Sequence, residues 1–412
     1  MIVRKIREDE AKKAVELFNI AFEFQMDDKK NNEEIIKDME GNLSDRPSLY
    51  WRERWAAFED DDKTMMGCMQ VIPYQIRFDG HVVMMGGIGG VATYPPYRRQ
   101  GAIRECFRLC LDDMYQKGHV FSLLYPFSRA YYRKFGYENG IEATQWTINF
   151  KGVKPFQTEG SAYLYRAGED ISDFKAIYDG FSENYNFMVV REKEDFEYIK
   201  KVNAFKDKKY AYVWKNKDGI PKAYMIFNKE RVGERIIMDC TRYYKPNDFC
   251  FSDDEGFRGL MDLALTFSAD YQAIRFRLPS QMRLGALISE GNELAREVSY
   301  VGMLRVINVE KALQLAEYKG SGQLSIRIHD IYCPWNDGVW HLAFTDGKST
   351  GVSRDNAETY DMELDIATFS TLLGGCRDKS DFPYFKDIKI IHDSEHIEKV
   401  FYMKNSFHCD FY

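Results

Sequence analysis

A basic turn stands near residue 100 and could bind a charged ligand. It consists of Arg98, Arg99, Gln100, Gly101, Ala102, Ile103 and Arg104. The turn precedes an expected helix, whose first turn leaves backbone N–H groups without partners and carries partial positive charge. Glycine at 101 lets the backbone approach a ligand closely, and the arginines can add charge-assisted hydrogen bonds. These features predict a site for the phosphates of an anionic ligand.

The elements on either side of this turn favour the same interpretation. The preceding strand, expected over residues 81–93, is rich in glycine and could lie along an extended ligand. The following helix, expected over 101–117, has an apolar stripe made of Ile103, Cys106, Phe107, Cys110 and Met114. A basic surface turn that merely starts a helix is the alternative. The pattern is not the dinucleotide fingerprint, because these glycines precede the turn.

A tyrosine one strand and one helix later could donate a proton. Residues 120–125 form a continuous apolar strand, and Ser128 is placed to cap a short helix through 135. Tyr132 lies on that helix, and a tyrosine hydroxyl, with a reference pKa of about 10, can protonate a leaving group. Anchoring the helix in the core is the alternative role, which we predict for Tyr131 and Tyr137 instead.

These residues need a sheet to position them. Strands are expected over 2–6, 55–58, 64–77 and 81–93, with a helix over 9–24 after the first of them. Asp79-Gly80 predicts a tight hairpin between the last two strands. The first part of the chain therefore predicts antiparallel strands followed by a strand–helix–strand crossover.

Two later parts of the chain have patterns of their own. Residues 211–227, 235–242, 254–269 and 273–278 repeat the order hairpin, strand, helix and strand without a basic turn. The pattern alone leaves open whether they form a second copy of the same fold. From about residue 303 the expected elements are helices over 309–318, 365–373 and 394–404 and strands over 323–329 and 339–345.

The segment from residue 90 to 137 resembles the GNAT acetyltransferases, and more narrowly the enhanced-intracellular-survival (Eis) type. The motifs that carry the resemblance are residues 97–103, Tyr131-Tyr132-Arg133-Lys134-Phe135-Gly136-Tyr137 and Cys333-Pro334-Trp335-Asn336-Asp337-Gly338. The resemblance implies an α+β (α/β GNAT-type) fold with two tandem GNAT-like domains followed by a sterol-carrier-protein-like α+β domain. The implied domains are 1–150, which binds acetyl-CoA and is catalytic, 151–295, which is degenerate, and 296–412, which ends in the active site. It also implies a homohexamer.

The resemblance assigns a co-substrate, acetyl-CoA, and the residues that contact it. They are Val91, Ala92, Thr93, Arg98, Arg99, Gln100, Gly101, Ala102, Ile103, Arg104, Phe127 and Ser128. At one of these positions the family often has serine, where this chain has Phe127 with Ser128 beside it.

The resemblance also implies an acetyl-CoA-dependent N-acetyltransferase with two catalytic groups and an acceptor pocket. Tyr132 is the implied general acid, and the α-carboxylate of Tyr412 is the implied general base. A carboxylate with a reference pKa of about 3.5 is a weak base unless it is desolvated or assisted by water. The pocket would draw on Phe22, Glu23, Phe24, Trp51, Trp55 and Asp410. Its acidic residues suit small polycationic amines, and aminoglycosides are the family expectation.

The bulk composition excludes several classes of protein. A chain of 412 residues suggests two to three domains, and its net charge of -7 argues against a nucleic-acid binder. None of its eight cysteines forms a C-x-x-C pair, which indicates free thiols in a reducing cytoplasm. No zinc-type spacing of Cys and His occurs, so no metal is expected. The N-terminus does not read as a signal peptide, and no apolar run approaches a membrane span.

Three functions are consistent with these features of the sequence. Direct acetyl transfer in a ternary complex leads, because no cysteine has the neighbours needed for a covalent acyl intermediate. A protein or peptide lysine acetyltransferase differs from it only in the acceptor. A lipid or acyl-CoA carrier built on the C-terminal module, with the other domains as scaffold, is the alternative from a different class.

Overall fold

In the computed structural model, residues 1–24, 29–36, 53–241, 249–287 and 293–410 are described. The chain divides into two compact units. Of the described residues, the first unit contains 1–141 together with 302–404, and the second contains 142–301 together with 405–410. The sequence-based boundaries near 150 and 295 therefore fall close to the two crossings, but the N-terminal and C-terminal thirds share one unit.

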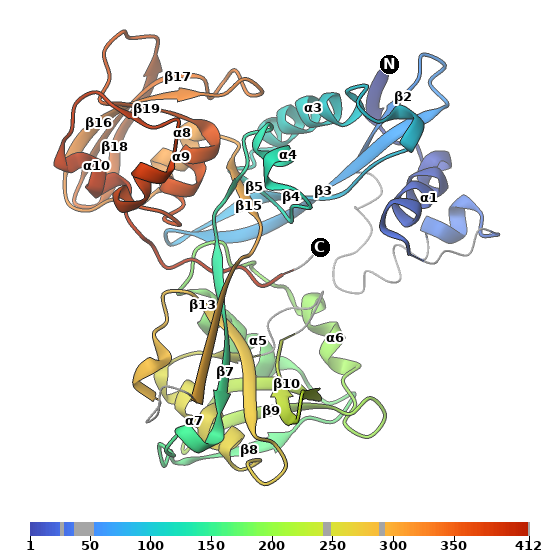
Figure 1. The fold of residues 1–412 in the computed structure, drawn as a ribbon, viewed down its shortest axis with the longest axis vertical. Helices are drawn as coiled ribbons and strands as arrows, with labels where there is room; N and C mark the ends of the chain where they lie inside the picture. Colours follow the sequence, from blue (N-terminus) through green and yellow to red (C-terminus); the bar gives the residue numbers. More distant parts are fainter. Residues whose placement is uncertain (25–28, 37–52, 242–248, 288–292, 411–412) are drawn as a thin grey trace. The chain divides into compact units, whose positions relative to one another are not determined.

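The first unit is built on a seven-stranded sheet (Figure 1). Its strands, in spatial order, are β1 (Ile2–Lys5), β2 (Arg54–Phe58), β3 (Met65–Phe78), β4 (His81–Thr93), β5 (Phe121–Leu124), β15 (Met303–Val306) and β6 (Glu138–Asn139). β3 and β4 form the predicted hairpin, and Asp79 and Gly80 both have positive φ, as a tight turn with the twist of the strands requires. β4 and β5 are parallel, with helix α3 (Ala102–Gln116) between them.

Helices cover both faces of this sheet. The apolar stripe of α3 packs with Ala57, Val71 and Ile88 on one face. On the other face Ala14 and Leu17 of helix α1 (Ala11–Phe22) pack with other side chains of β2 and β3. Because side chains alternate along a strand, the two faces have separate cores made from neighbouring residues.

The second unit repeats this architecture. Its sheet has the order β14 (Leu294–Tyr300), β7 (Glu142–Asn149), β13 (Ala273–Pro279), β11 (Arg235–Asp239), β10 (Pro221–Val232), β9 (Lys209–Asn216) and β8 (Gly160–Leu164), with β12 (Phe249–Phe251) paired to β10. β11 and β13 are parallel, and helix α7 (Asp254–Leu265) lies between them in sequence as α3 does between β4 and β5. Helices α5 (Ser172–Ser182) and α6 (Glu197–Lys200) follow β8. The repeat suggested by the sequence is therefore present in the fold.

Each large sheet contains one strand from an unexpected part of the chain. β15 lies between β5 and β6, although nearly 160 residues of the second unit precede it. β7 lies between β13 and β14, although it directly follows the first unit. Residues 142–149, expected within the first domain, lie in the second sheet because their pairing partners are β13 and β14.

The C-terminal module of the first unit has its own five-stranded sheet, in the order β18 (Lys348–Asp355), β17 (Gly338–Thr345), β16 (Gly322–His329), β19 (Met362–Asp365) and β20 (Lys389–Ile390). Its helices are α8 (Val309–Leu315), α9 (Ile366–Leu373) and α10 (Glu395–Val400). The helix predicted from residue 365 is present as α9, and Asp365 caps it by accepting a hydrogen bond of 2.8 Å from the Thr368 N–H. α8 and α10 end earlier than predicted, because Ala316 and Phe401 are extended.

Within the described residues, no helix is long and apolar enough to cross a membrane. The same part of the chain shows no group of three or more His, Cys, Asp or Glu side chains that could hold a metal ion. All eight cysteines are buried free thiols, as the lack of pairing motifs predicted.

Candidate functional site

The site begins where β4 loses one of its two neighbours. Pairing of β4 with β5 ends at Ile88 opposite Leu124, whereas pairing of β4 with β3 continues to Thr93. Between these points β4 has a bulge, and Gly90 within it has φ of 58°. A bulge bends its strand, and glycine adopts this backbone conformation without strain. The last residues of β4 therefore have backbone polar groups on the side where β5 no longer pairs with them, and we call this segment the β4 notch (residues 89–93).

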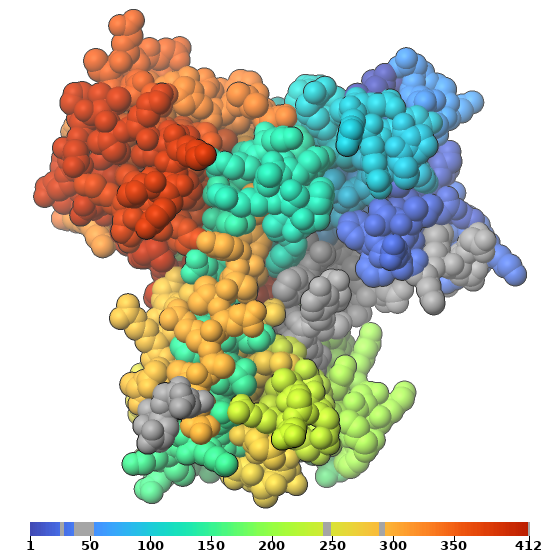
Figure 2. All heavy atoms as spheres, in the orientation of Figure 1, coloured from blue at the N-terminus to red at the C-terminus, as the bar shows by residue number. Residues whose placement is uncertain are grey.

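The basic turn follows the β4 notch and opens helix α3. Gly101 is the N-cap residue with φ of 89°, and no side chain caps the helix. The first intrahelical hydrogen bond runs from the Glu105 N–H to the Gly101 carbonyl at 3.1 Å. The N–H groups of the intervening residues are therefore free of helical partners. Arg98 and Arg99 are exposed beside them, and α3 lies at the surface (cyan in Figure 2). This arrangement fits the diphosphate of an acyl donor.

Gln100 has a structural task in the same turn. Its side-chain Nε2 donates to the Pro96 carbonyl at 2.9 Å, which closes the loop on itself. Arg104 is exposed and interacts with neighbouring Glu105. The arginine side chains and the backbone, rather than the Gln100 amide, are thus available to a ligand.

Tyr132 lies on the short helix α4 (Arg129–Arg133), which packs against α3. Its side chain is 4% exposed, and its ring meets Phe107 and Phe127 edge-on, with centroids 6.2 Å and 5.3 Å away. Burial, and to a lesser degree Tyr131, raises the pKa of Tyr132 well above its ordinary value. The hydroxyl consequently keeps its proton at neutral pH, as a proton donor must.

Two residues near Tyr132, Ser128 and Tyr137, have the structural roles that the sequence predicted. Ser128 caps α4 by accepting a hydrogen bond from the Tyr131 N–H at 3.3 Å. Tyr137 is buried, and its hydroxyl hydrogen-bonds to Ser122 at 2.7 Å, which confirms its core role. Phe127 is 73% exposed, so its ring can cover an extended ligand without rearrangement of the core.

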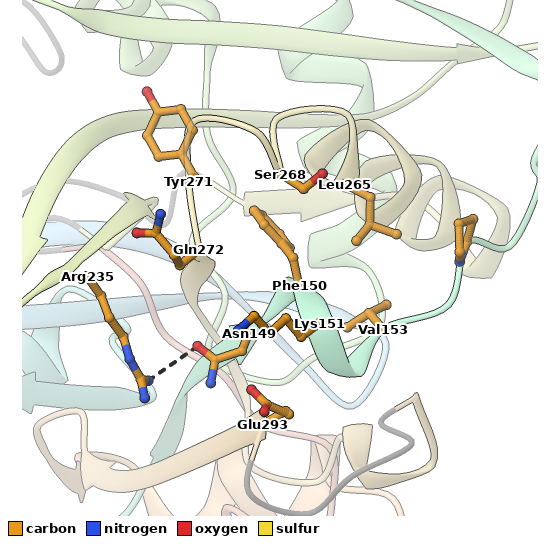
Figure 3. Close-up of a pocket in the computed structure, with 11 residues that line it drawn as sticks. Asn149, Phe150, Lys151, Val153, Arg235, Leu265, Ser268, Tyr271, Gln272 and Glu293 are labelled. Atoms are coloured by element: carbon orange, nitrogen blue, oxygen red, sulfur yellow. Dashed lines mark hydrogen bonds between the residues drawn. The ribbon is translucent and has the colours of Figure 1, made fainter.

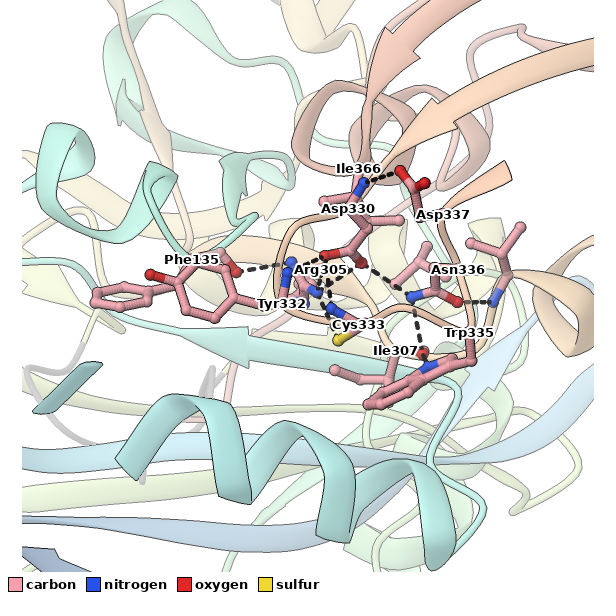
Figure 4. A network of polar contacts seen from close by, with 12 residues as sticks. Phe135, Arg305, Ile307, Asp330, Tyr332, Cys333, Trp335, Asn336, Asp337 and Ile366 are labelled. Carbon is pink, nitrogen blue, oxygen red and sulfur yellow. Dashed lines mark hydrogen bonds and ion pairs between the residues drawn. The ribbon is translucent and has the colours of Figure 1, made fainter. Parts of the chain in front are cut away.

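An arginine from the far end of the first sheet supports the end of α4 (Figure 4). Arg305, on β15, donates from Nη1 to the Phe135 carbonyl at 2.7 Å. Its Nη2 donates to both oxygens of Asp330, at 2.7 and 2.9 Å, and to the Cys333 sulfur at 2.8 Å. Burial lowers the pKa of Arg305, but Asp330 more than offsets this, and the pKa lies above its ordinary value. The guanidinium is therefore a permanent cation inside the unit.

The Cys333–Gly338 motif forms the other side of this network. Asp330 accepts hydrogen bonds from the Cys333 N–H and from Asn336 Nδ2, each at 3.1 Å. Trp335 donates from its indole to the Ile307 carbonyl at 2.8 Å, and its ring stacks on Tyr115 of α3. The motif quoted for the resemblance thus joins the C-terminal module to the sheet that carries the candidate site. The sequence did not predict a role for Arg305, although the two motifs that it contacts, at Gly136 and at Cys333, were both singled out.

The side chains predicted for an acceptor pocket separate into groups. Phe22 and Phe24 are about half exposed and lie with Phe18 in an aromatic cluster, with centroids 4.7 to 6.3 Å apart. Phe18 lies 3.4 Å from the position that a Cβ on Gly90 would take, so this cluster borders the β4 notch. Glu23 is exposed at the end of α1.

Trp55 is not brought together with this cluster. Its side chain packs with the α3 core on the opposite face of the sheet, below Lys5. Trp51 lies outside the described residues.

The C-terminal segment is anchored within the second unit. Asn186 exchanges backbone hydrogen bonds with the segment, to the Asn405 carbonyl at 2.9 Å and from the Phe407 N–H at 3.0 Å. Asp410 pairs with the fully buried Arg191 at 2.9 Å. Residues 406–409 of this segment are buried, and Asp410 is neutralised by its pairing, so it is not a free acidic group for a cationic acceptor. Tyr412, the predicted base, lies outside the described residues.

The described start of α7 in the second unit differs from the start of α3, because it is acidic. The N-cap of α7 is Asp253, whose carboxylate accepts from the Gly256 N–H at 2.9 Å, and Asp254 and Glu255 follow it. Three acidic side chains at a helix start occupy or repel the position that a phosphate would need. The acidic start of α7 is therefore unfavourable for binding a phosphate.

A pocket of about 510 Å³ lies elsewhere in the second unit (Figure 3). It is lined by Asn149, Phe150, Lys151, Val153, Pro155, Arg235, Leu265, Ser268, Tyr271, Gln272 and Glu293. These residues gather at the C-terminal end of α7 and the starts of β11 and β13, the opposite end of the crossover from a phosphate-binding turn. The pocket therefore does not correspond to the candidate site of the first unit.

Comparison with known proteins agrees with this geometry. Residues 2–140 match the acetyltransferase (GNAT) domain family, and residues 309–409 match the sterol carrier protein domain family. An uncharacterized N-acetyltransferase of Streptomyces avermitilis is 22% identical over 353 residues, covering 79% of this chain and 82% of that protein.

Two solved structures share the fold along the whole chain. A GCN5-related N-acetyltransferase from Anabaena variabilis aligns with a TM-score of 0.81 at 18% identity, with 100% of both chains covered. Eis1 from Mycobacterium abscessus aligns with a TM-score of 0.78 at 17% identity, again with 100% of both chains covered. The predicted fold class, GNAT-type domains followed by a sterol-carrier-like domain, is confirmed.

Proposed function

We propose that this GNAT N-acetyltransferase moves an acetyl group from acetyl-CoA directly to a primary amine at the β4 notch, with Tyr132 as general acid. The observation that carries the proposal is the arrangement within the first unit. The β4 notch and the uncapped start of α3 belong to the crossover from β4 to β5, and the buried Tyr132 lies on α4, the helix that directly follows β5.

The donor would bind along the crossover in an extended form. The N–H groups at the start of α3, with Arg98 and Arg99, would hold the phosphates. The backbone of Val91, Ala92 and Thr93, which lies beyond the end of the pairing with β5, would pair with the amide groups of the pantetheine arm, as a strand would. The exposed ring of Phe127 would cover that arm.

The transfer would need one bond to form and one to break. The neutral amine attacks the thioester carbonyl carbon, the C–N bond forms, and the C–S bond breaks as the tetrahedral intermediate collapses. Tyr132 gives its proton to the departing sulfur, and the amine nitrogen loses a proton to a base. Because a desolvated thiolate also has a raised pKa, the raised pKa of Tyr132 does not prevent this proton transfer.

The base proposed for the amine proton is the α-carboxylate of Tyr412. The support is the firm anchoring of the preceding residues, with Phe407, His408 and Cys409 buried and Asp410 paired. A chain end held in this way can present a carboxylate at a fixed place, unlike a frayed terminus. Adding one residue after Tyr412 should abolish most activity while leaving acetyl-CoA binding intact, and unchanged turnover would exclude this base.

The acceptor class proposed from the resemblance is a small polycationic amine such as an aminoglycoside. Exposed Glu23 beside Phe22 and Phe24 supports a site for an amine with both charged and apolar contacts. Lysine side chains of peptides are the nearer alternative. The carrier function gains no support in the described residues, because α9 of the C-terminal module is buried along its whole length within the first unit.

A homohexamer and a cytoplasmic location complete the proposal. The first rests on the resemblance and is tested by light scattering of the purified protein. The second is supported by eight buried free thiols, which a reducing compartment preserves.

The experiment that tests the function is release of the CoA thiol from acetyl-CoA, measured with aminoglycosides, polyamines and lysine peptides. We expect thiol release that depends on a primary amine and falls sharply in Tyr132→Phe. Binding of acetyl-CoA without thiol release for every amine would refute the proposed enzyme activity.

A further inference from the structure

The face of the first sheet that borders the aromatic cluster carries a cation without a counterion. Ala56 and Phe58 of β2 pack in the core under α1, whereas Ala57 packs under α3. Because successive side chains alternate between faces, Arg54 lies on the α1 face. Its Cα lies opposite Gln70 of β3, and Gln70 lies opposite Gly89 of β4. Arg54, Gln70 and Gly89 are therefore opposite one another on three adjacent strands, and Gly89 is the first residue of the β4 notch.

Arg54 has no anionic partner in the described part of the chain. Its Nε is buried and makes no hydrogen bond there. Burial lowers the pKa of Arg54, and Cys68 is the group whose charge would oppose this shift. Burial raises the pKa of the Cys68 thiol itself to about 11. That thiol is neutral at pH 7, so it supplies no negative charge. Arginine stays protonated in proteins, so the cation persists.

Arg54 is half-buried, and three other arginines of this chain that are buried or half-buried have an anionic partner. Arg191 faces Asp410 at 2.9 Å, Arg275 faces Asp239 at 2.7 Å, and Arg305 faces Asp330 at 2.7 Å. Buried charges are paired as a rule, because an unpaired one loses its hydration without compensation. An exception that lies beside a reaction site calls for a ligand that brings the missing anion.

The donor's phosphates do not meet this need. They are proposed to lie at the start of α3, and Thr93, the last residue of β4 before that turn, is already about 13 Å along the strand from Gly89 at 3.3 Å per residue. Two strand spacings, about 10 Å, separate Arg54 from β4, and an extended arginine side chain spans most of that distance. A carboxylate on the acceptor would therefore lie within reach of Arg54 while the amine lies at β4.

We infer that the acceptor carries a carboxylate as well as its amine, that Arg54 binds this carboxylate, and that the substrate class is a free amino acid or a similar small amino acid derivative. Gln70, whose Nε2 lies 3.2 Å from the position of a Cβ on Gly89, can add a hydrogen bond beside the notch. Phe22 and Phe24 would contact an apolar part of the same molecule. The inference rests on the proposed function and replaces the polycationic acceptor with a zwitterion.

The test compares acceptors that differ only in the carboxylate. Thiol release from acetyl-CoA is measured with phenylalanine against 2-phenylethylamine and with lysine against cadaverine, and kanamycin represents the polycations. We expect kcat/KM at least about tenfold higher for the carboxylated member of each pair, as the loss of one charged hydrogen-bond partner predicts. In Arg54→Met this preference should vanish while KM for acetyl-CoA stays unchanged, and Arg54→Lys should keep part of it.

Lys13→Gln is the matched control, because it removes a positive charge from α1 at an exposed position and should leave the preference intact. Equal rates for both members of each pair, acetylation of kanamycin alone, or a preference that survives in Arg54→Met would each overturn the inference and leave the proposed function standing. If no amine releases thiol although calorimetry shows that acetyl-CoA binds, the proposed function itself fails. Thermal melting of each variant shows whether it folds. If Arg54→Met does not fold, the acceptor preference measured in Arg54→Lys tests the inference instead.

Discussion

Gly136 lies so close to the side chain of Arg305 that there is no room for a Cβ at position 136. A Cβ there would overlap the Arg305 guanidinium, with the Arg305 Cζ and the Ile366 Cγ2 each only 2.8 Å away. Gly136 also has φ of 81°, a conformation that favours glycine. The guanidinium reaches through this gap to the Phe135 carbonyl and so fixes the helix end that carries Tyr132.

Gly136→Ala should therefore destabilise the protein by about 3 kcal/mol, from overpacking and backbone strain together. Gly118→Ala is the control, since Gly118 has a similar φ of 77° but nothing within 4 Å of its Cβ position, and it should cost only about 1 kcal/mol. Urea unfolding of both variants measures the difference. Equal losses would mean that the contact with Arg305 is not tight.

Tyr132→Phe should lower kcat by about 100-fold or more and leave the Kd for acetyl-CoA within about twofold, because only the transferred proton is lost. Tyr131→Phe is the control, since that ring adjoins Tyr132 on the same helix. Steady-state kinetics and calorimetry separate the two constants. A parallel fall in binding and turnover would assign Tyr132 to binding instead.

Arg99→Gln should raise the Kd for acetyl-CoA by about tenfold, as expected when one charged contact to a phosphate is removed. The same change should make binding less sensitive to salt. Arg108→Gln, also exposed but paired with Glu105 one turn into α3, should alter binding little. If both changes have the same small effect, the phosphates lie elsewhere.

Asp410→Asn should destabilise the anchoring of the tail by about 3 kcal/mol, since it leaves the fully buried Arg191 without its counterion. Arg191→Met combined with Asp410→Leu should recover much of this loss, because it removes both charges together. Chemical unfolding of the single and double variants gives the comparison. A double variant no better than the single one would show that the pair contributes specific attraction rather than mutual neutralisation.

The tail should also loosen in acid. Burial lowers the pKa of His408 below its ordinary value of 6.5, with Asp410 opposing part of this shift. The undocked histidine takes up a proton below about pH 6.5 and the docked one resists it, so docking is strongest above that pH and weakens as the pH falls. Hydrogen exchange of residues 405–410 should be slow at pH 7.5 and faster at pH 5.5 after correction for intrinsic rates. His408→Gln should remove this dependence.

Local features of this fold could be read from the sequence because neighbouring residues determine them. The limits of β4, the hairpin at Asp79, the caps at Ser128 and Asp365 and the glycine that opens α3 all follow from turn and cap chemistry. The candidate phosphate site could be predicted for the same reason, since it is a strand, a turn and a helix in direct succession.

Features that depend on distant partners could not be read in this way. Arg305 and Phe135 are 170 positions apart, and Arg191 and Asp410 are 219 positions apart. No periodicity links such residues, so the support of α4 and the neutralisation of Asp410 emerge only when the chain is folded. Arg54 gives no signal in the sequence either, because a single arginine in a strand reveals neither its burial nor its lack of a partner.

The place of β15 in the first sheet has a consequence for biosynthesis. The ribosome delivers β5 long before β15, because residues 125–302 must be made in between. At 5–20 residues per second this interval lasts roughly 10–35 s, during which the edge of β5 waits without its permanent neighbour. A nascent chain in that state exposes an unpaired strand, so chaperone binding during synthesis should concentrate there, and a fragment ending near residue 150 should aggregate when expressed alone.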